Sequence, residues 1–157
     1  MYSNELVLKI LEYIDNNINK KITTEELSKK FFFNKDYIMR IFKKELKVTI
    51  LDYINKKRIY NSLKELKETN DLMLKIALNN GFTSQEYYSE TFTKILGVNP
   101  ITYRKFTKIN SQITEEELNT IRSNLQNLLN FIKETDTYKR NIKTTETKKL
   151  SLFQTKS

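Results

Sequence analysis

The sequence predicts an all-α protein in which two helix-turn-helix subdomains are joined by a long linker helix and followed by a C-terminal helical extension. Three observations support this fold class. The 157 residues include two glycines and one proline, which disfavours an architecture of many tight β-turns. Apolar residues recur at helical spacing along most of the chain. Finally, the chain repeats itself at an offset of 50 residues.

The first subdomain, residues 1–48, is predicted to hold three helices. Apolar side chains four residues apart favour an amphipathic helix over about 4–19. Thr23 and Glu26 form a capping box, so a second, short helix should begin near residue 24. Asn34 can cap a third helix that runs to about residue 46. A helix, a tight turn and a second helix together make a helix-turn-helix.

The linker helix is predicted within residues 49–68, because the segment from residue 50 to about 67 contains no glycine or proline. A single rod of roughly 25 to 28 Å is expected. The second subdomain spans residues 69–106. Asn70 and Asp71 can cap a helix over 72–80, which Gly81 ends by accepting a positive φ.

Two more helices follow in the second subdomain. Thr83 and Glu86 form another capping box, which opens a helix through about residue 95 that Gly97 closes. Pro100 then permits one more short helix, to about residue 106.

The repeat is the observation that depends least on composition. At an offset of 50 residues there are six identities in 17 aligned positions, against about one expected by chance. The pairs are Tyr37 with Tyr87, Phe42 with Phe92, Lys44 with Lys94, Leu46 with Leu96, Val48 with Val98, and Tyr53 with Tyr103. Two copies of one supersecondary unit are the economical interpretation.

The C-terminal third differs in character. Residues 107–136 are predicted to form an amphipathic helix that begins at a capping box of Thr114 and Glu117. Its apolar residues follow heptad spacing: Leu118, Ile121, Leu125, Leu128 and Ile132. Docking on the chain's own domain is slightly favoured over pairing with a second chain through 113–134 or binding a partner protein. Residues 137–157 are expected to be a disordered basic tail.

Composition excludes several classes of function. Without cysteine or histidine the chain has no disulfide, thiol nucleophile or imidazole base, and neither a metal site nor a Gly-rich cofactor cradle is expected. We therefore expect a protein without enzymatic activity or cofactor. A net charge of +9 favours a polyanionic partner, which is nucleic acid or an anionic membrane surface. No apolar run could span a bilayer and no export signal is evident, so a cytoplasmic location is expected.

Four stretches resemble the DNA-binding domain of the AraC/XylS family. They are residues 22–28 (ITTEELS), 37–45 (YIMRIFKKE), 76–82 (IALNNGF) and 97–104 (GVNPITYR). The resemblance covers about residues 6–106 in order and spacing. It implies a bacterial transcription regulator whose two helix-turn-helix subdomains bind a double-stranded promoter site as one unit and bend it.

The resemblance also implies a mode of action. Because the match begins within the first few residues, we expect no preceding sensor domain, as in the short stand-alone activators of the family. Those members bind as monomers and contact RNA polymerase. Activation rather than repression is therefore an expectation that rests on the family alone.

Carried over by position, the family's first reading helix directs five residues to DNA: Lys35, Asp36, Met39, Arg40 and Lys43. Ile38, Ile41 and Phe42 then belong to the core. Arg40 is the best candidate for reading a base, because a guanidinium fork pairs bidentately with guanine, and the alternative is a phosphate contact or a solvated charge. Lys35 and Lys43 are better suited to neutralising phosphates.

In the second reading helix the family's contacts fall on six residues: Ser84, Gln85, Glu86, Ser89, Glu90 and Thr93. Gln85 can pair with adenine. Glu90 stands where the family usually has arginine and Thr93 where a basic residue is common, so this subdomain is expected to bind more weakly or to read another sequence. Phe32 replaces a usual glycine, which predicts that the first turn is rebuilt.

Two questions remain open from the sequence. Arg58 and Arg104, with the neighbouring Lys57 and Lys105, could contact the DNA backbone or form internal ion pairs. The alternative to a DNA-binding function is a helical adaptor whose C-terminal amphipathic helix acts on a protein partner or an anionic membrane.

Overall fold

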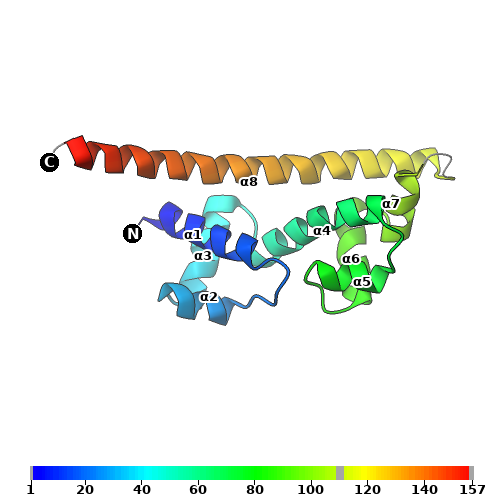
Figure 1. Ribbon diagram of the computed structural model, residues 1–157, viewed down its shortest axis with the longest axis horizontal. Coiled ribbons are helices and arrows are strands. Elements are labelled where there is room, and N and C mark those ends of the chain that lie inside the picture. The colour runs from blue at the N-terminus through cyan, green and yellow to red at the C-terminus, as the bar shows by residue number, and fades with distance from the viewer. Residues whose placement is uncertain (1, 109–111, 156–157) are drawn as a thin grey trace.

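The computed structural model describes residues 2–108 and 112–155, which form eight helices and no strand. The all-α prediction is therefore confirmed over these residues. The helices are α1 (Ser3–Asn16), α2 (Thr24–Phe31), α3 (Lys35–Leu46), α4 (Ile50–Glu68), α5 (Met73–Asn79), α6 (Gln85–Leu96), α7 (Pro100–Phe106) and α8 (Glu115–Thr155). Figure 1 shows α8 running along one side of the other seven.

The 50-residue repeat in the sequence is a repeat in the structure. α3 and α6 begin at Lys35 and Gln85, and α4 and α7 begin at Ile50 and Pro100, so each pair of starts is 50 residues apart. The buried aromatic pairs repeat as well. The ring centroids of Phe42 and Tyr53 lie 5.9 Å apart, and those of Phe92 and Tyr103 lie 5.6 Å apart, both edge to face. Each copy therefore builds its core around the same contact.

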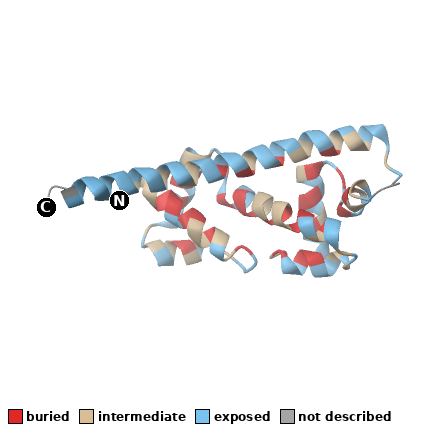
Figure 2. Cartoon of the chain, turned by 45° about the horizontal axis from the view of Figure 1, so that its top comes forward, coloured by how far each residue is buried: buried red, intermediate tan, exposed pale blue. Residues whose placement is uncertain are grey.

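Each subdomain has its own hydrophobic core. The first is built from α1, α2, α3 and the start of α4, with Ile10, Leu27 and Phe42 fully buried. The second gathers the rest of α4 with α5, α6 and α7, around Leu66, Tyr88 and Phe92. Ile50, Tyr53 and Ile54 of α4 belong to the first core, and Ile59, Leu63 and Leu66 belong to the second. Figure 2 shows that buried residues occur in both groups of helices beneath α8. α4 is thus shared by both cores.

The helix caps agree with the sequence signals in most places. Thr23 accepts from the amide of Glu26 at 3.1 Å, and Asn34 accepts from that of Asp36 at 2.8 Å. The carboxylate of Glu26 accepts instead from the Tyr13 hydroxyl at 2.7 Å, which ties α2 to α1. That hydrogen bond raises the pKa of Tyr13, because a neighbouring carboxylate disfavours the phenolate.

Two predicted caps are wrong. α5 starts after Leu72, which makes no side-chain cap, rather than at Asn70 or Asp71, because the Thr69 hydroxyl accepts from the amide of Asp71 and turns the chain first. α6 is capped by Ser84 rather than Thr83, since Ser84 accepts from the amide of Tyr87 at 3.1 Å. In both cases the helix begins a residue or more later than the motif indicated.

The turn between α2 and α3 keeps its left-handed residue although no glycine stands there. Phe32 has φ 59° and ψ 37°, and its side chain is 92% exposed. The expectation of a rebuilt turn is therefore wrong. The ring projects into solvent, so the strained backbone is retained without disturbing the pose of α3. Lys47, which ends α3, is likewise left-handed, where the second copy has Gly97.

Phe32→Gly should therefore stabilise the protein. Glycine relieves the left-handed strain and the exposed ring gives up no buried contact, so the free energy of unfolding in urea should rise by about 1 kcal/mol. The matched control is Phe33→Gly, which removes a half-buried ring that stacks on Tyr37 at 5.4 Å and should lower stability. A loss of stability in Phe32→Gly would show that the ring has a structural role.

Arg58 and Arg104 bind backbone carbonyls inside the protein, and neither side chain is fully exposed. Arg58 is buried and donates to the carbonyls of Ile18 at 2.9 Å and Lys20 at 2.7 Å. Burial lowers the pKa of Arg58, although a guanidinium stays protonated at any physiological pH. Arg104 donates to the carbonyls of Leu66 and Asp71. Each arginine donates to two backbone carbonyls of its own chain, and neither forms the predicted ion pair with a described residue.

α8 corrects the expectation of a disordered tail. The predicted amphipathic helix does not end near residue 136, because α8 continues unbroken to Thr155. Lys139, Lys143 and Lys149 pair with Asp15, Glu12 and Glu5 of α1. Residues 137–155 were expected to be disordered because they are polar, but tertiary contacts of this kind outweigh weak local hydrophobicity.

The apolar stripe of α8 lies against the rest of the chain. Ile121, Leu128 and Ile132 are buried, and Leu118 and Leu125 are partly buried. Of the three predicted alternatives, which were docking on the chain's own domain, pairing with a second chain and binding a partner protein, the structure has the first. Thr114 and Glu117 form the full capping box, with each side chain bonded to the other residue's amide. Among the described residues no helix has both the length and the apolarity that a membrane span requires.

Candidate nucleic-acid interface

α3 presents the five predicted residues on one exposed face. Ile38, Ile41 and Phe42 are buried, and this leaves the opposite side of the helix in solvent. The exposed residues are the five predicted ones, Lys35, Asp36, Met39, Arg40 and Lys43, together with Lys44. Lys35 also makes an ion pair with Glu25 at 3.5 Å, which is exposed and therefore weak.

Arg40 lies at the centre of this face. Its guanidinium carbon sits 5.5 Å from the centroid of the Tyr37 ring. The described residues place no carboxylate within ion-pair distance of it, so its five donors are directed to solvent. A cation that rests on an aromatic ring is oriented without being neutralised. That arrangement suits a side chain that must present its donors to a ligand.

α6 exposes most of its predicted residues in the same way. Tyr88, Thr91, Phe92 and Leu96 are buried. The predicted contacts Gln85, Glu86, Glu90 and Thr93 are exposed, and Ser84 and Ser89 are partly buried. Ser84 uses its oxygen as the helix cap, and Thr93 donates its hydroxyl to the carbonyl of Ser89 at 2.8 Å. These hydroxyls are therefore partly committed to the helix itself.

The two reading helices differ in charge. α3 carries four basic and two acidic residues, whereas α6 carries one basic and two acidic residues. Phosphates attract the first helix and are repelled by the exposed carboxylates of the second, Glu86 and Glu90. α3 is therefore the helix with the net positive charge, and α6 has a net negative charge.

The C-terminal ends of both helices meet α8. The Tyr138 hydroxyl donates to the carboxylate of Glu45 in α3 at 3.2 Å, and the Asn124 amide donates to the carbonyl of Leu96 in α6 at 3.1 Å. Both helices then run away from α8 (Figure 1). The N-terminal turns, which carry Asp36 and Gln85, therefore lie away from α8. Helix-turn-helix proteins contact base edges with the N-terminal residues of the reading helix.

The geometry adds residues that sequence reasoning missed. Met39, Arg40 and Lys43 line one side of an apolar groove of about 520 Å³, and Leu51 of α4, 59% exposed, lines the other. Tyr87 of α6 accepts a hydrogen bond from Asn55 of α4 at 2.9 Å. The exposed apolar residue at the start of α4 could have been noticed in the sequence, but its closeness to α3 depends on the turn between them.

The buried hydroxyl of Tyr88 fixes α6 against the linker helix. It donates to Ser62 of α4 at 2.9 Å. Burial raises the pKa of Tyr88 above its ordinary value, although the bond to Ser62 acts in the opposite direction. The pose of α6 on α4 is thus held by this hydrogen bond and by that from Asn55 to Tyr87, as well as by packing.

Comparison with known proteins agrees with this geometry. A family model described as a helix-turn-helix domain matches residues 27–105, about half of the chain. The fold and the match together define a helix-turn-helix DNA-binding protein. More particularly, the chain belongs to the AraC/XylS family of transcription regulators. The match ends before α8, which lies outside the family model.

Several relatives are informative. The transcriptional activator AarP of Providencia stuartii is 28% identical over 103 residues, which cover 66% of this chain and 76% of AarP. The multiple antibiotic resistance protein MarA of Salmonella typhimurium is 32% identical over 95 residues, covering 60% of this chain and 75% of MarA. YbfP of Bacillus subtilis is 32% identical over 108 residues, or 69% of this chain, which amount to 37% of YbfP.

Solved structures share the fold. The C-terminal domain of AraT from Geobacillus stearothermophilus aligns over 70% of this chain and 92% of that domain, with 25% identity and a TM-score of 0.63. The DNA-binding domain of AdpA, solved with a target DNA, aligns over 62% of this chain and 88% of its own, with 17% identity and a TM-score of 0.58. At that identity the likeness concerns the fold alone.

The described residues contain nothing that suggests a metal centre, since no three potential ligands among histidine, cysteine and acidic residues come together there. The family to which the chain belongs consists of transcription regulators. The function is therefore to be sought in DNA recognition.

Proposed function

We propose that this protein is a sequence-specific regulator of transcription that inserts α3 and α6 into adjacent major-groove segments of one promoter site. The observation that carries the proposal is the pair of exposed helices, each capped at its N-terminus and each 50 residues from its counterpart. An α-helix fits the major groove, where each base pair shows a distinct pattern of donors and acceptors.

In this proposal the two subdomains have different tasks. Arg40 reads a guanine with both arms of its guanidinium, while Lys35 and Lys43 neutralise phosphates. Gln85 pairs with an adenine and Glu90 accepts from a cytosine amino group. Because α6 is acidic, the second subdomain contributes selectivity more than affinity.

The duplex should bend on binding. α3 and α6 reach α8 at Tyr138 and Asn124, which are about 21 Å apart along its axis at 1.5 Å per residue. Successive major-groove faces of straight B-form DNA are roughly 34 Å apart. A bend toward the protein brings the two grooves closer together, so that both helices can enter.

The decisive experiment is selection of binding sites from a random duplex pool, followed by footprinting of the selected site. Two protected segments on one face of the duplex are expected. The affinity should fall steeply with salt, with a logarithmic slope of about −0.9 per phosphate contact. In Lys43→Ala the affinity should fall for all sequences alike and the slope should decrease by about 1. A pool that returns no common sequence would overturn the proposal.

We further propose that the protein activates transcription as a monomer on DNA, in contact with RNA polymerase, in the bacterial cytoplasm. The similarity to AarP, a transcriptional activator, supports the direction of regulation. The adaptor alternative has less support, because the apolar stripe of α8 packs on its own domain instead of facing a partner or membrane. An adaptor would keep its activity in Arg40→Ala, and the proposed regulator would not.

A further inference from the structure

α8 contributes to both hydrophobic cores. Ile121 and Leu128 belong to the buried cluster of the second subdomain, and Phe131 and Tyr138 pack against the buried cluster of the first. Apart from α8, the subdomains are connected through α4 and through a contact between the loop after α1 and Gly81, where a Cβ atom would lie 2.6 Å from the carbonyl oxygen of Ile18. The family match stops at residue 105, so this second connection is an addition to the matched domain.

The attachment to the second subdomain is close. Asn124 donates to the carbonyl of Leu96, the last residue of α6, and Gly97 follows with φ 80°. A Cβ atom on Gly97 would lie 2.5 Å from the Cγ2 atom of Thr120. The absence of a side chain at residue 97 is therefore what allows α8 to approach the end of the reading helix.

The attachment to the first subdomain is polar and partly buried. Lys139 of α8 contacts the carboxylate of Asp15 at 2.6 Å, and the Tyr53 hydroxyl donates to the other oxygen of Asp15 at 2.6 Å. One carboxylate thus joins α1, α4 and α8. The ammonium of Lys56 adds a contact with the Phe131 ring, 4.6 Å from its centroid.

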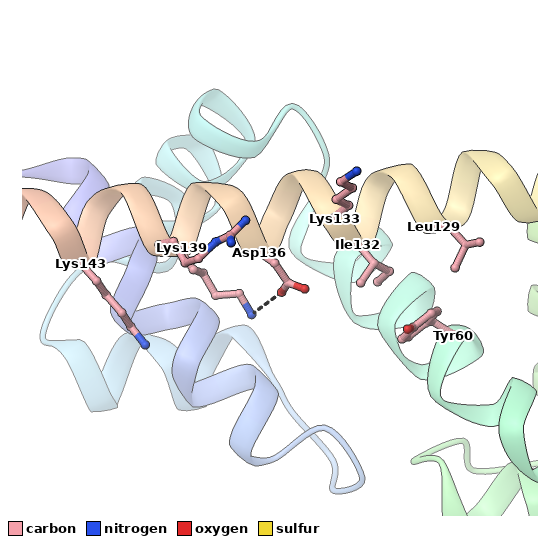
Figure 3. Close-up of a pocket in the computed structure, with 8 residues that line it drawn as sticks. Tyr60, Leu129, Ile132, Lys133, Asp136, Lys139 and Lys143 are labelled. Carbon is pink, nitrogen blue, oxygen red and sulfur yellow. Dashed lines mark ion pairs between the residues drawn. The ribbon is translucent and has the colours of Figure 1, made fainter.

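The same stretch of α8 also covers α4. Figure 3 shows Ile132 and Leu129 on the side of α8 that faces Tyr60 of α4. Lys143 is directed toward α1, where it pairs with Glu12. Lys139 is held a second time, by Asp136 one turn earlier at 3.3 Å. Although burial disfavours its charge, the hydrogen bond and attraction of Asp15 prevail and raise the pKa of Lys139. The attachment therefore persists across the neutral pH range.

The two contacts with the reading helices lie nearly on the same face of α8. Asn124 and Tyr138 are 14 residues apart, and at about 100° per residue they differ by only about 40° around the helix. A straight helix that holds the ends of α3 and α6 on one face sets both their separation and their relative rotation.

We propose that α8 is a brace that fixes the spacing of the two reading helices and thereby restricts the protein to DNA sites with one distance between half-sites. The spacing preference rests on the proposed function, whereas the brace itself does not. Without it, α4 and the small contact between Ile18 and Gly81 would hold the subdomains less firmly and allow them to adapt to several spacings.

The brace can be cut between its two attachments. Asn130 is exposed and lies between Leu128 and Phe131, so Asn130→Pro interrupts the helix without removing either attachment. Asn130→Ala is the matched control, because it loses the same exposed bond to Gln126 and keeps the helix. The chain has no cysteine, so spin labels can be attached at Lys44→Cys and Lys94→Cys, which are equivalent exposed positions on α3 and α6.

The full chain and Asn130→Ala should give one narrow distance distribution between the labels. In Asn130→Pro the distribution should broaden at least about twofold, as expected when two bodies keep only α4 and the small contact between Ile18 and Gly81. If Asn130→Pro does not fold, Tyr138→Ala combined with Lys139→Ala removes the first attachment and leaves a favourable helix sequence. If either variant folds and its distribution of distances between the labels is the same as that of the full chain, the proposal that α8 is a brace is wrong.

The spacing preference is tested on a selected site with one base pair inserted between its halves, which rotates them by roughly 35°. The full chain should lose about tenfold or more in affinity, and Asn130→Pro should lose less than about threefold. Equal losses would overturn the spacing preference. Broadened distances without any sequence-specific binding would instead uphold the brace and refute the proposed function.

Discussion

Replacing Arg40 with alanine is expected to abolish sequence preference at one base pair and to cost about 1–3 kcal/mol of binding free energy. The side chain is exposed, is oriented by the Tyr37 ring and has no carboxylate partner among the described residues. Its donors are therefore available to guanine without first breaking an ion pair. Fluorescence anisotropy on a selected duplex and on scrambled DNA measures the specific and non-specific affinities separately.

Two control variants separate the effect of the bidentate guanidinium geometry of Arg40 from the effect of its positive charge. Arg40→Lys keeps the positive charge but loses the bidentate geometry, so non-specific binding should be retained while the preference is lost. Arg122→Ala removes an equal charge from an exposed position on α8, away from α3, and should change both affinities little. A uniform loss on all sequences in Arg40→Ala would mean that Arg40 contacts a phosphate, the alternative to base reading.

Replacing Gly81 with alanine is expected to lower the free energy of unfolding by about 2–4 kcal/mol. The φ angle of Gly81 is 87°, a region that disfavours any side chain. The added Cβ would also lie 2.6 Å from the carbonyl oxygen of Ile18 and 2.7 Å from the Nε atom of Arg58. Those two atoms are hydrogen-bonded to each other, so the methyl group would separate the buried guanidinium from its acceptor. Urea denaturation followed by circular dichroism measures the loss.

Gly97→Ala provides the comparison at a similar φ of 80°. There the nearest atoms belong to the side chains of Thr120 and Asn124, which can move with α8, so the loss should be smaller. If the two substitutions cost the same, the left-handed backbone alone would account for both, and the contact with Arg58 would contribute nothing. A change below about 0.5 kcal/mol in Gly81→Ala would contradict the prediction.

Local signals predicted most of the fold. The Thr23 and Asn34 caps lie where the sequence places them, and α3 and α6 keep the 50-residue offset that the identities indicated. The buried and exposed sides of α3 also follow from periodicity, since a helix that packs on one core has one apolar face. The role of Arg58 did not follow, because its acceptors are carbonyls 38 and 40 residues earlier, which only the folded chain brings near.

The sequence by itself determined the helices, their duplication and the residues that α3 and α6 turn to solvent, because caps and helical periodicity act over a few residues. Only the tertiary structure decided that the C-terminal segment is one helix to Thr155 and that it joins both subdomains. Its contacts, such as Lys139 with Asp15, join residues 124 positions apart. A polar segment of that kind is ordered by what it docks against, and its own composition does not reveal the partner.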